Sequence, residues 1–470
     1  MAVRVRFAPS PTGHFSIGNA RTALFNWLFA KNEGGEFLLR IEDTDKERSE
    51  KKFEDDITHG LEWLGLKWDG EITRQSERSE IYKTNLNKLL KDGLAYWCFC
   101  TTEELEIERQ AQLSQGLAPK YSGRCRSIPH EESQKRLKKE TAVIRFKMPE
   151  KTIAFHDIIR GKVEFNTALM GDIIIAKNLD EPLYNFTAAV DDFEMKITHV
   201  IRGEDHLSNT PKQIALQETL GFSHPHYAHL PLILGPDRKK LSKRFVEHSL
   251  LDYKSDGYLP QAFLNFLVLL GWHPEEDKEV LNTNEMIKEF SLKRVQKGGA
   301  IFNPEKLEWF NGHYIKTLPA NELFEHLKPF IPAFWLNQET MIKKIVEVER
   351  TRLKRLTDFA KQTSFLFMLP DYPKDLLSWK QTKDSITLAN LKKVLGIIKK
   401  MSDAEFQKSE IEKSIMAITE ENGRGEVLWP LRVALSGEEA SPGPIELIDI
   451  LGKTETIARI EIAINKIKTG

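Results

Sequence analysis

Cysteine is scarce in this sequence, with three residues among 470. So few cysteines argue against a disulfide scaffold and are typical of a reducing compartment, so we expect a cytoplasmic protein. Long apolar runs are also missing: the longest extends from Phe263 to Leu270, is interrupted by Asn265, and is far shorter than the roughly 20 residues that span a bilayer. The first residues lack the basic and apolar segments of a secretory signal. We therefore expect no membrane partner.

An excess of charge of either sign is absent as well. Lysine plus arginine number 68 and aspartate plus glutamate number 69, which gives a formal net charge of −1. Overall charge therefore does not indicate a nucleic-acid partner, which would need a local basic face. Apolar residues make up 40% and charged residues 29%, as in an ordinary globular protein. A chain of 470 residues is too long for one core, and about two to four domains are expected.

The order of patterns along the chain predicts an α/β protein whose parallel sheet is interrupted by an insertion. Strand and helix patterns alternate over residues 1–97 and again over 186–250. Residues 98–185 contain all three cysteines and several short strand-like runs, which predicts an α+β insertion with its own small sheet. Beyond residue 250 helical periodicity dominates, and we divide this all-α region into residues 251–320, 321–375 and 376–470.

The N-terminal residues have the pattern of a phosphate-binding unit. Arg4 to Ala8 form a predicted strand, Pro9 to Gly13 a turn, and Ser16 to Asn19 the start of an amphipathic helix. Unpaired N–H groups and the positive end of a helix dipole favour a phosphate at such a helix start. A second predicted strand, 36–41, ends in the acidic residues 42–45. The pattern predicts half of a nucleotide-binding unit with carboxylates at its edge.

A cationic segment, residues 239–244, follows the turn Gly235-Pro236-Asp237. Clustered cations in a loop can stabilise the charge that develops on a leaving pyrophosphate. The alternative is a solvated basic loop, which is the more common role of a run of charges. The phosphate-binding pattern near the N-terminus favours the first interpretation.

Six separated motifs, in collinear order, carry a resemblance to a known family. They are Pro9-Ser10-Pro11-Thr12-Gly13, Ala20-Arg21-Thr22-Ala23-Leu24, Arg40-Ile41-Glu42-Asp43-Thr44-Asp45, Asp191-Asp192, Arg202-Gly203-Glu204-Asp205-His206 and Leu241-Ser242-Lys243-Arg244. The sequence resembles the bacterial glutamyl-tRNA synthetases, which are class I aminoacyl-tRNA synthetases, over almost its whole length. The resemblance implies a Rossmann-type catalytic domain, an inserted module that binds the acceptor end, a stem-contact helical domain at 251–320, and anticodon-binding subdomains at 321–375 and 376–470.

The resemblance implies ATP-dependent attachment of L-glutamate to tRNA(Glu). The glutamate α-carboxylate would attack the α-phosphorus of ATP, which carries Mg²⁺ on its phosphates, to give glutamyl-adenylate and pyrophosphate. A ribose hydroxyl at the 3′ end of the tRNA would then take the acyl group. Whether tRNA(Gln) is charged as well stays open, and we expect a monomer.

Glutamate carries two carboxylates and one ammonium group, so its pocket needs two cations and one acidic partner. The planar fork of arginine suits a carboxylate. The resemblance places Arg6 at the side-chain carboxylate, Arg202 at the α-carboxylate and Glu42 near the ammonium group. It also implies three further lining residues: Ala8, Ser10 and Tyr184. The alternatives are a surface role for Arg6 and a salt bridge from Arg202 to Glu204 or Asp205.

ATP is expected to lie over the start of the first helix, and the resemblance gives catalytic roles to Lys243, Ser16 and Gly18. The full set of residues implied to contact ATP is Pro11, Thr12, Gly13, Ser16, Ile17, Gly18, Asn19, Lys240, Leu241, Ser242, Lys243 and Arg244.

The helix start departs from the family pattern, because Ser16-Ile17-Gly18-Asn19 stands where the family has H-I-G-H or H-I-G-G. Ser16 can cap the helix and donate one hydrogen bond. His14 is a weaker replacement for the lost imidazole, since alternate residues of an extended segment point to opposite sides. We expect an active enzyme that is handicapped in adenylate formation. The alternative is a catalytically impaired paralogue that binds tRNA or glutamate as a regulator.

All three cysteines fall in one pattern, Cys98-Phe99-Cys100 with Cys125, which predicts a structural zinc site. Zinc prefers four ligands. Zinc-bearing members of the family add a C-x-H pair, but Ser127 stands at the histidine position. The resemblance favours Tyr121 as the fourth ligand over His130. The alternative is three unligated thiols in a folded insertion.

Binding of tRNA needs a basic face in the helical region, and one cluster is present there: Lys343, Lys344, Arg350, Arg352, Lys354 and Arg355. Helical spacing would place Arg350 beside Lys354, and Arg352 beside Arg355, as a face for phosphates. The resemblance puts an anticodon-reading arginine near here, with Arg350 and Arg352 as candidates. The alternative is a solvated helix face.

Overall fold

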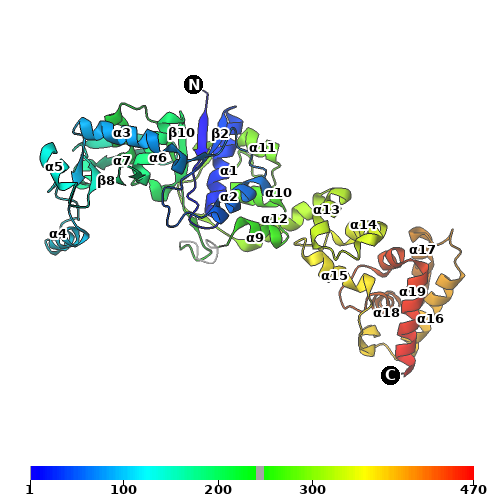
Figure 1. Ribbon diagram of the computed structural model, residues 1–470. Helices are drawn as coiled ribbons and strands as arrows, with labels where there is room; N and C mark the ends of the chain where they lie inside the picture. Colours follow the sequence, from blue (N-terminus) through cyan, green and yellow to red (C-terminus); the bar gives the residue numbers. More distant parts are fainter. Residues whose placement is uncertain (1, 240–247, 470) are drawn as a thin grey trace. The chain divides into compact units, whose positions relative to one another are not determined.

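The computed structural model describes residues 2–239 and 248–469 (Figure 1). Predictions for Lys240, Leu241, Ser242, Lys243 and Arg244 therefore lie outside the described residues. The chain folds into two compact units, the first made of Met1–Ser255 and Pro260–Leu307, and the second of Asp256–Leu259 and Glu308–Gly470. Among the described residues, no helix combines the length and the apolar character needed to cross a membrane.

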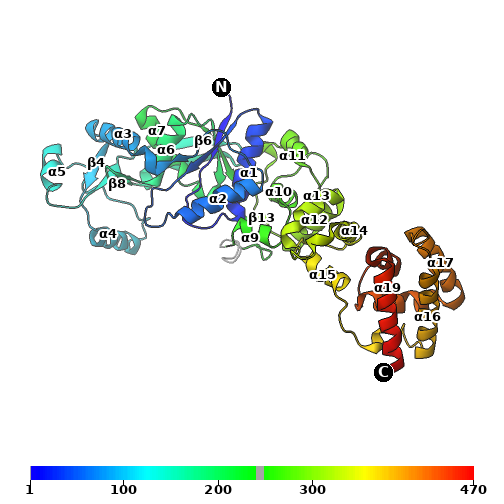
Figure 2. The ribbon, with the colours of Figure 1, turned by 45° about the vertical axis from the view of Figure 1, so that its right-hand side comes forward.

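A parallel sheet forms the centre of the first unit (Figure 2). Its strands are β1 (Arg4–Phe7), β2 (Glu36–Ile41), β3 (Thr73–Arg74), β10 (His199–Gly203) and β11 (His226–Leu230). β1, β2 and β3 pair in parallel, as do β10 and β11. The N–H of Thr198, just before β10, donates to the carbonyl of Arg4 in β1 (2.9 Å). The strand order β3-β2-β1-β10-β11 confirms the predicted Rossmann-type arrangement.

Two helices make the central crossovers of this sheet: α1 (Ile17–Asn32) connects β1 to β2, and α7 (Thr210–Leu220) connects β10 to β11. The two connections run in opposite directions from the centre, so right-handed crossovers place α1 and α7 on opposite faces. Most of α1 is buried, including Ala20, Leu24 and Leu28. Because the strand order reverses between β1 and β10, their carboxyl ends border a crevice.

The insertion contains an antiparallel sheet in the order β4-β5-β8-β9. These strands are β4 (Ala95–Cys98), β5 (Val143–Phe146), β8 (Ile173–Asn178) and β9 (Glu181–Pro182). The hairpin of β6 (Thr152–Asp157) and β7 (Gly161–Asn166) belongs to the central sheet instead, because Asp157 pairs with Tyr227 of β11. The expectation that the insertion has a sheet entirely of its own is therefore wrong for this hairpin. β6 satisfies backbone groups that would otherwise be unpaired at the edge of β11.

The first unit also contains further α-helices and a pair of short strands, some of them within the insertion. They are α2 (Lys51–Trp63), α3 (Ser79–Lys91), α4 (Thr102–Ser114), α5 (His130–Arg136), α6 (Tyr184–Glu194), β12 (Ile233–Leu234), α9 (Leu250–Ser255), α10 (Pro260–Val268), α11 (Thr283–Glu289) and β13 (Ala300–Ile301). α12 (Pro304–Thr317) begins in the first unit and continues into the second.

The second unit is helical, as predicted. Its helices are α13 (Ala320–Leu327), α14 (Glu339–Glu349), α15 (Asp358–Phe367), α16 (Asp384–Lys400), α17 (Lys408–Asn422), α18 (Arg424–Ser436) and α19 (Pro444–Thr469). Buried Arg459 donates to the carbonyls of Phe365, Leu366 and Leu435 at the carboxyl ends of α15 and α18. A cation suits these positions because helix ends carry unpaired carbonyls and negative partial charge.

The predicted shared faces of the basic cluster are wrong. α14 ends at Glu349, and residues 350–357 form turns rather than a continued helix. The carbonyl of buried Glu349 accepts from the N–H of Arg352 (2.8 Å), and its carboxylate binds the Arg352 guanidinium (3.1 Å). This local turn removes the helical spacing from which the faces were inferred.

Gly257 provides a test of the packing in the second unit. Its φ is +87°, and an added Cβ would lie 2.7 Å from the backbone N of Thr357 and 2.8 Å from that of Leu356. We expect Gly257→Ala to reduce the free energy of unfolding by about 2–4 kcal/mol through backbone strain and overpacking. The measurement is the thermal unfolding midpoint. The matched control is Gly396→Ala in α16, where no described residue outside the surrounding helix backbone lies within 4 Å of the added carbon and helix propensity gains up to about 1 kcal/mol. Equal midpoints for the two variants would contradict this packing.

Candidate active site

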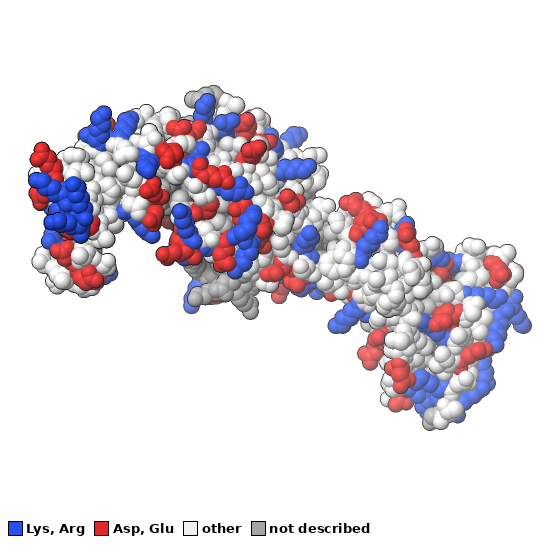
Figure 3. Space-filling view, in the orientation of Figure 1, with Lys and Arg blue, Asp and Glu red and all other residues white. Residues whose placement is uncertain are grey.

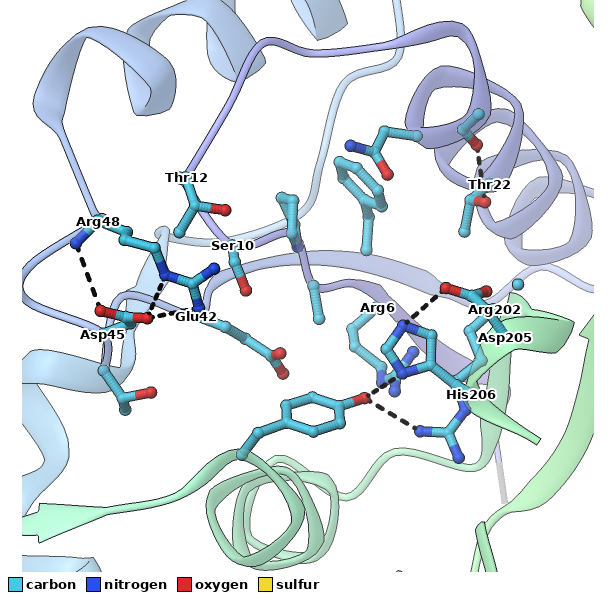
Figure 4. A pocket seen from close by; sticks show the side chains of 18 of the residues that line it. Arg6, Ser10, Thr12, Thr22, Glu42, Asp45, Arg48, Arg202, Asp205 and His206 are labelled. Atoms are coloured by element: carbon cyan, nitrogen blue, oxygen red, sulfur yellow. Dashed lines mark hydrogen bonds and ion pairs between the residues drawn. The ribbon is translucent and has the colours of Figure 1, made fainter. Parts of the chain in front are cut away.

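A cavity of about 1030 Å³ opens at the carboxyl ends of β1 and β10, where the strand order reverses (Figure 4). Its wall comes from the turn after β1, the start of α1, the acidic segment after β2, the start of α6 and the end of β10. All six residues predicted to bind glutamate line this cavity: Arg6, Ala8, Ser10, Glu42, Tyr184 and Arg202. Segments that are far apart in the sequence thus meet at one site.

Arg202 lies at the end of β10 with only 5% of its surface exposed. Its Nε donates to Nε2 of His229 (3.3 Å), its Nη2 to the hydroxyl of Thr210 (2.8 Å), and its Nη1 to the hydroxyl of Tyr184 (3.4 Å). All three acceptors are uncharged. A buried guanidinium held only by neutral groups is costly unless an anion joins it. Arg202 therefore marks the place of an anionic group of a ligand.

The alternative role of Arg202, a salt bridge to a neighbouring acidic residue, is not what the structure shows. Glu204 pairs with Arg160 (2.6 Å), and Asp205 lies 3.7 Å from His206. Within residues 2–239 and 248–469, Arg202 forms no ion pair. Its positive charge remains uncompensated there.

Arg6 in β1 is also buried and is anchored by one carboxylate. Its Nε donates to Asp192 (2.9 Å), which also accepts from Arg40 (2.9 Å). Burial opposes ionisation of Asp192, but the two guanidinium groups outweigh it and lower the pKa of Asp192 to about 2. The alternative of a surface role for Arg6 is therefore wrong. Asp192 fixes the position of the Arg6 side chain, and Arg6 also lines the cavity.

A network of paired charges lies beside the cavity, and Arg202 is not part of it. Three guanidinium groups and three carboxylates pair with one another, and they belong to Arg6, Arg40, Arg78, Glu42, Asp191 and Asp192. Arg202 adds one positive charge to this set. An anionic group of a ligand at Arg202 would therefore meet a guanidinium that no carboxylate of this set neutralises.

The start of α1 forms the opposite part of the wall, where Ser16, Gly18 and Asn19 lie together with Thr12. Ser16 occupies the N-cap with an extended backbone, but its side chain makes no capping hydrogen bond to the described residues, so the expected side-chain cap is not formed. Of the other predicted ATP contacts, Pro11, Gly13 and Ile17 are not in the wall, and Ile17 is completely buried.

His14 does not replace the imidazole that the family has at position 16. Its Nδ1 lies 3.3 Å from the carboxylate of Asp56, and its ring packs edge-on against Phe53 at 5.2 Å between centroids. Both partners belong to α2, and His14 is not in the cavity wall. The alternation of side chains in the extended segment accounts for this direction.

Sequence patterns gave no role to several polar residues at this site, among them Arg40, His206, Thr210 and His229. His206 lines the cavity and lies 3.0 Å from the Tyr184 hydroxyl. Burial and the charge of Arg202 lower the pKa of His206 to about 4, so it is neutral at physiological pH. The sequence signal that could have pointed to His229 is its place between the apolar residues Ala228 and Leu230 at the end of β11.

The three cysteines meet in the insertion, as predicted. Their sulfur atoms all lie within 4.8 Å of one another, with Cys100 and Cys125 3.6 Å apart. The Tyr121 hydroxyl lies 3.4 Å from Cys98 and 3.5 Å from Cys100. His130 is exposed at the start of α5 and is not part of the group.

The two arginines predicted to contact tRNA make intramolecular contacts. Arg350 donates to the carbonyl of Leu318 (3.1 Å). Arg352 binds buried Glu349 and donates to the carbonyl of Ala440 (3.4 Å). Both contacts are within the second unit.

Comparisons with known proteins agree with this geometry. Residues 2–309 match the catalytic domain of the class I tRNA synthetases (E and Q), and residues 322–464 match an anticodon binding domain. The glutamate–tRNA ligase 2 of Thermoanaerobacter pseudethanolicus is 45% identical, over 99% of this chain and 98% of its own. The chain belongs to the glutamate–tRNA ligase family.

Further relatives match over the same extent. The glutamate–tRNA ligase of Thermodesulfovibrio yellowstonii is 44% identical over 98% of this chain and 99% of its own. A crystal structure of a glutamate tRNA ligase from Elizabethkingia meningosepticum, in complex with its amino acid, is 38% identical with a TM-score of 0.89 and covers 99% of both chains. These relatives are ligases, and the regulatory paralogue is not favoured.

The proposed role of Glu42 can be tested by measuring how the KM for glutamate depends on pH. Burial raises the pKa of Glu42 against the attraction of Arg40 and Arg6. Its carboxylate is therefore lost at a higher pH than that of an ordinary glutamate, and a ligand ammonium group would lose its partner there. We expect the KM for glutamate to rise as pH is lowered, and Glu42→Gln to raise it by about tenfold or more at neutral pH and to remove this pH dependence. Steady-state aminoacylation across pH measures both. A Glu42→Gln variant with the wild-type pH profile would contradict this role.

Proposed function

We propose that this member of the glutamate–tRNA ligase family attaches L-glutamate to the 3′ end of tRNA(Glu) through a glutamyl-adenylate. The observation that supports it most is Arg202, buried at the cavity without a carboxylate partner among the described residues. The α-carboxylate of glutamate would supply an anion to this guanidinium. The names of the relatives point to the same substrates.

In this proposal each charged group of glutamate meets one protein group. Arg202 binds the α-carboxylate, Arg6 the side-chain carboxylate, and Glu42 the ammonium group. Ala8, Ser10 and Tyr184 complete the pocket, which is lined by them in the structure. Arginine forks suit both carboxylates because each can donate two parallel hydrogen bonds.

ATP would lie over the start of α1, where the wall contains Thr12, Ser16, Gly18 and Asn19. The positive end of the α1 dipole favours its phosphates, and Mg²⁺ would be carried by the phosphate oxygens, which are its preferred ligands. An oxygen of the α-carboxylate bonds to the α-phosphorus, and the bond to the pyrophosphate breaks. A ribose hydroxyl of the tRNA then attacks the acyl carbon, and AMP leaves. Lys243 is proposed to stabilise the leaving pyrophosphate.

The proposed function is tested by incubating the full chain with labelled glutamate, ATP and separate transcripts of tRNA(Glu) and tRNA(Gln). Labelled tRNA(Glu) is the expected product. Binding of tRNA or glutamate without any labelled product would support the regulatory alternative instead. The tRNA(Gln) reaction decides whether this second tRNA is also a substrate.

Ser16 gives a second prediction. An imidazole at this position would add a donor to the ATP phosphates as charge develops on them. We expect Ser16→His to raise the rate of adenylate formation by about three- to tenfold, measured by glutamate- and tRNA-dependent pyrophosphate exchange. Ser16→Ala is the matched control and should not increase the rate. An unchanged or lower rate in Ser16→His would show that Ser16 is no handicap.

We also propose that the insertion holds a structural zinc ion. Tetrahedral zinc with bonds of about 2.3 Å separates two thiolate sulfurs by about 3.8 Å, close to the 3.6 Å between Cys100 and Cys125. Cys98 and the Tyr121 hydroxyl would complete the four ligands. Burial raises the pKa of Tyr121, so the metal would have to displace its phenol proton. The ion would tie the segment around Tyr121 to the end of β4.

The zinc proposal predicts about one zinc per purified chain by elemental analysis. We expect Tyr121→Phe to weaken zinc retention against a chelator by at least about tenfold, because it removes one ligand. His130→Ala is the matched control and should retain zinc like the wild type. Wild-type protein without zinc, or loss of zinc in His130→Ala but not in Tyr121→Phe, would contradict the ligand set.

We assign the proposed tRNA contacts to basic side chains on the surfaces of the two units. Figure 3 shows lysine and arginine side chains gathered beside α5 and along α16. The last turns of these helices contain Lys135, Arg136, Lys399 and Lys400, which can neutralise phosphates. Residues 98–185 would receive the acceptor end, and 321–375 and 376–470 the anticodon. Arg350 and Arg352 remain the candidates for reading it.

A further inference from the structure

Two buried residues lie behind Arg202 without reaching the cavity wall. His229 of β11 and Asp157 at the end of β6 are both completely buried, and neither belongs to the residues that line the cavity. Nδ1 of His229 lies 2.6 Å from the Asp157 carboxylate. On the other side of the ring, Nε2 lies 3.3 Å from Nε of Arg202 and 3.0 Å from the hydroxyl of Thr210.

The surroundings of Asp157 fix the direction of these hydrogen bonds. One carboxylate oxygen accepts from the N–H groups of Ile159 (2.9 Å) and Arg160 (2.8 Å), and the other from the N–H of His229 (3.1 Å). Burial opposes ionisation of Asp157, but these hydrogen bonds and the one from the His229 ring lower its pKa. An ionised carboxylate only accepts, so the proton of the His229 ring must lie on Nδ1. Nε2 is then an acceptor.

The charge of His229 follows from the groups that face it. Asp157 lies on one side and Arg202 on the other, the guanidinium of Arg160 donates to the His229 carbonyl (3.3 Å), and the ring of Tyr227 stacks at 6.1 Å. Burial lowers the pKa of His229; the hydrogen bond to Asp157 opposes this, and the charges of Arg202 and Arg160 reinforce it. His229 is therefore neutral at physiological pH.

We propose that His229, held in one tautomer by Asp157, is a positioning residue that orients the Arg202 guanidinium toward the α-carboxylate of glutamate. A carboxylate in place of the imidazole would also hold Arg202, but it would neutralise the charge that the substrate needs. The neutral Nε2 lone pair fixes the Nε–H direction and leaves the positive charge for the ligand. This inference rests on the proposed role of Arg202.

Two substitutions at position 229 distinguish the role of Nε2, which faces Arg202, from that of Nδ1, which faces Asp157. Gln can place its amide oxygen near the position of Nε2 and still accept from Arg202, whereas Asn can only replace the Nδ1 donor to Asp157. We expect His229→Asn to raise the KM for glutamate by about tenfold to a hundredfold, the usual effect of losing a hydrogen bond to a charged group. His229→Gln should raise it less, and neither should change the KM for ATP.

Asp157→Asn tests the tautomer itself. Asn retains the oxygen that accepts from Ile159 and Arg160, but its NH₂ group would replace the oxygen that faces the backbone N–H and Nδ1 of His229. It would force the ring proton to Nε2, against the Nε–H of Arg202. We expect the KM for glutamate to rise as in His229→Asn. The ¹⁵N shifts of labelled histidine, assigned by the signal lost in His229→Gln, should show Nδ1–H in the wild type and Nε2–H in Asp157→Asn. Nε2–H in the wild type would overturn the proposal.

Arg202→Gln distinguishes failure of this inference from failure of the proposed function. Unchanged KM for glutamate in Arg202→Gln would refute the role of Arg202 itself. A raised KM in Arg202→Gln, with wild-type values in His229→Asn and Asp157→Asn, would refute only the positioning by His229. In the double variant, His229→Asn should add nothing to Arg202→Gln, because it acts through that side chain. Additive effects would indicate a merely structural role. Variants that fail to fold are recognised by thermal unfolding, and the wild-type ¹⁵N spectrum still decides the tautomer.

Discussion

A buried positive charge without a carboxylate partner among the described residues is the constraint on which the site depends. Folding must bring Arg202 out of water, and the three groups that receive its N–H bonds are all neutral. The protein thus orients the guanidinium without neutralising it. Arg6 contrasts with it, because Asp192 already compensates part of its charge. Of the two arginines proposed to bind glutamate, one is thus held by an anion and the other by neutral groups.

The topology of the sheet makes this arrangement possible. Arg6 comes from β1 and Arg202 from β10, and these neighbouring strands lie where the strand order reverses, so their carboxyl ends share one crevice. The insertion contributes as well. Its hairpin extends the sheet beside β11, which places Asp157 against His229. The pairing of Asp157 with Tyr227 thus connects the insertion to the strand that lies behind the candidate site.

The parts of this architecture with local signals were predictable from the sequence. β1, the turn after it, the start of α1 and β2 follow from strand alternation, breaker residues and helical periodicity. The family motifs pointed to the six residues that meet at the cavity. The path of β6 and β7 was not predictable, because pairing at a sheet edge depends on contacts between segments about 70 residues apart. The turn after Glu349 was missed for a different reason: its buried carboxylate binds Arg352, three residues on, and the helix ends although the apolar periodicity continues. His229 gave only the weak signal of a histidine between Ala228 and Leu230, at the buried end of its strand.

The central claim is that the α-carboxylate of glutamate supplies the anion for Arg202. It is tested most directly by comparing inhibition or binding constants of L-glutamate and 4-aminobutyrate, which lacks that carboxylate, in the wild type and in Arg202→Gln. The account predicts a strong preference for glutamate in the wild type and nearly equal constants in the variant. A variant that weakens both ligands by the same factor would contradict it.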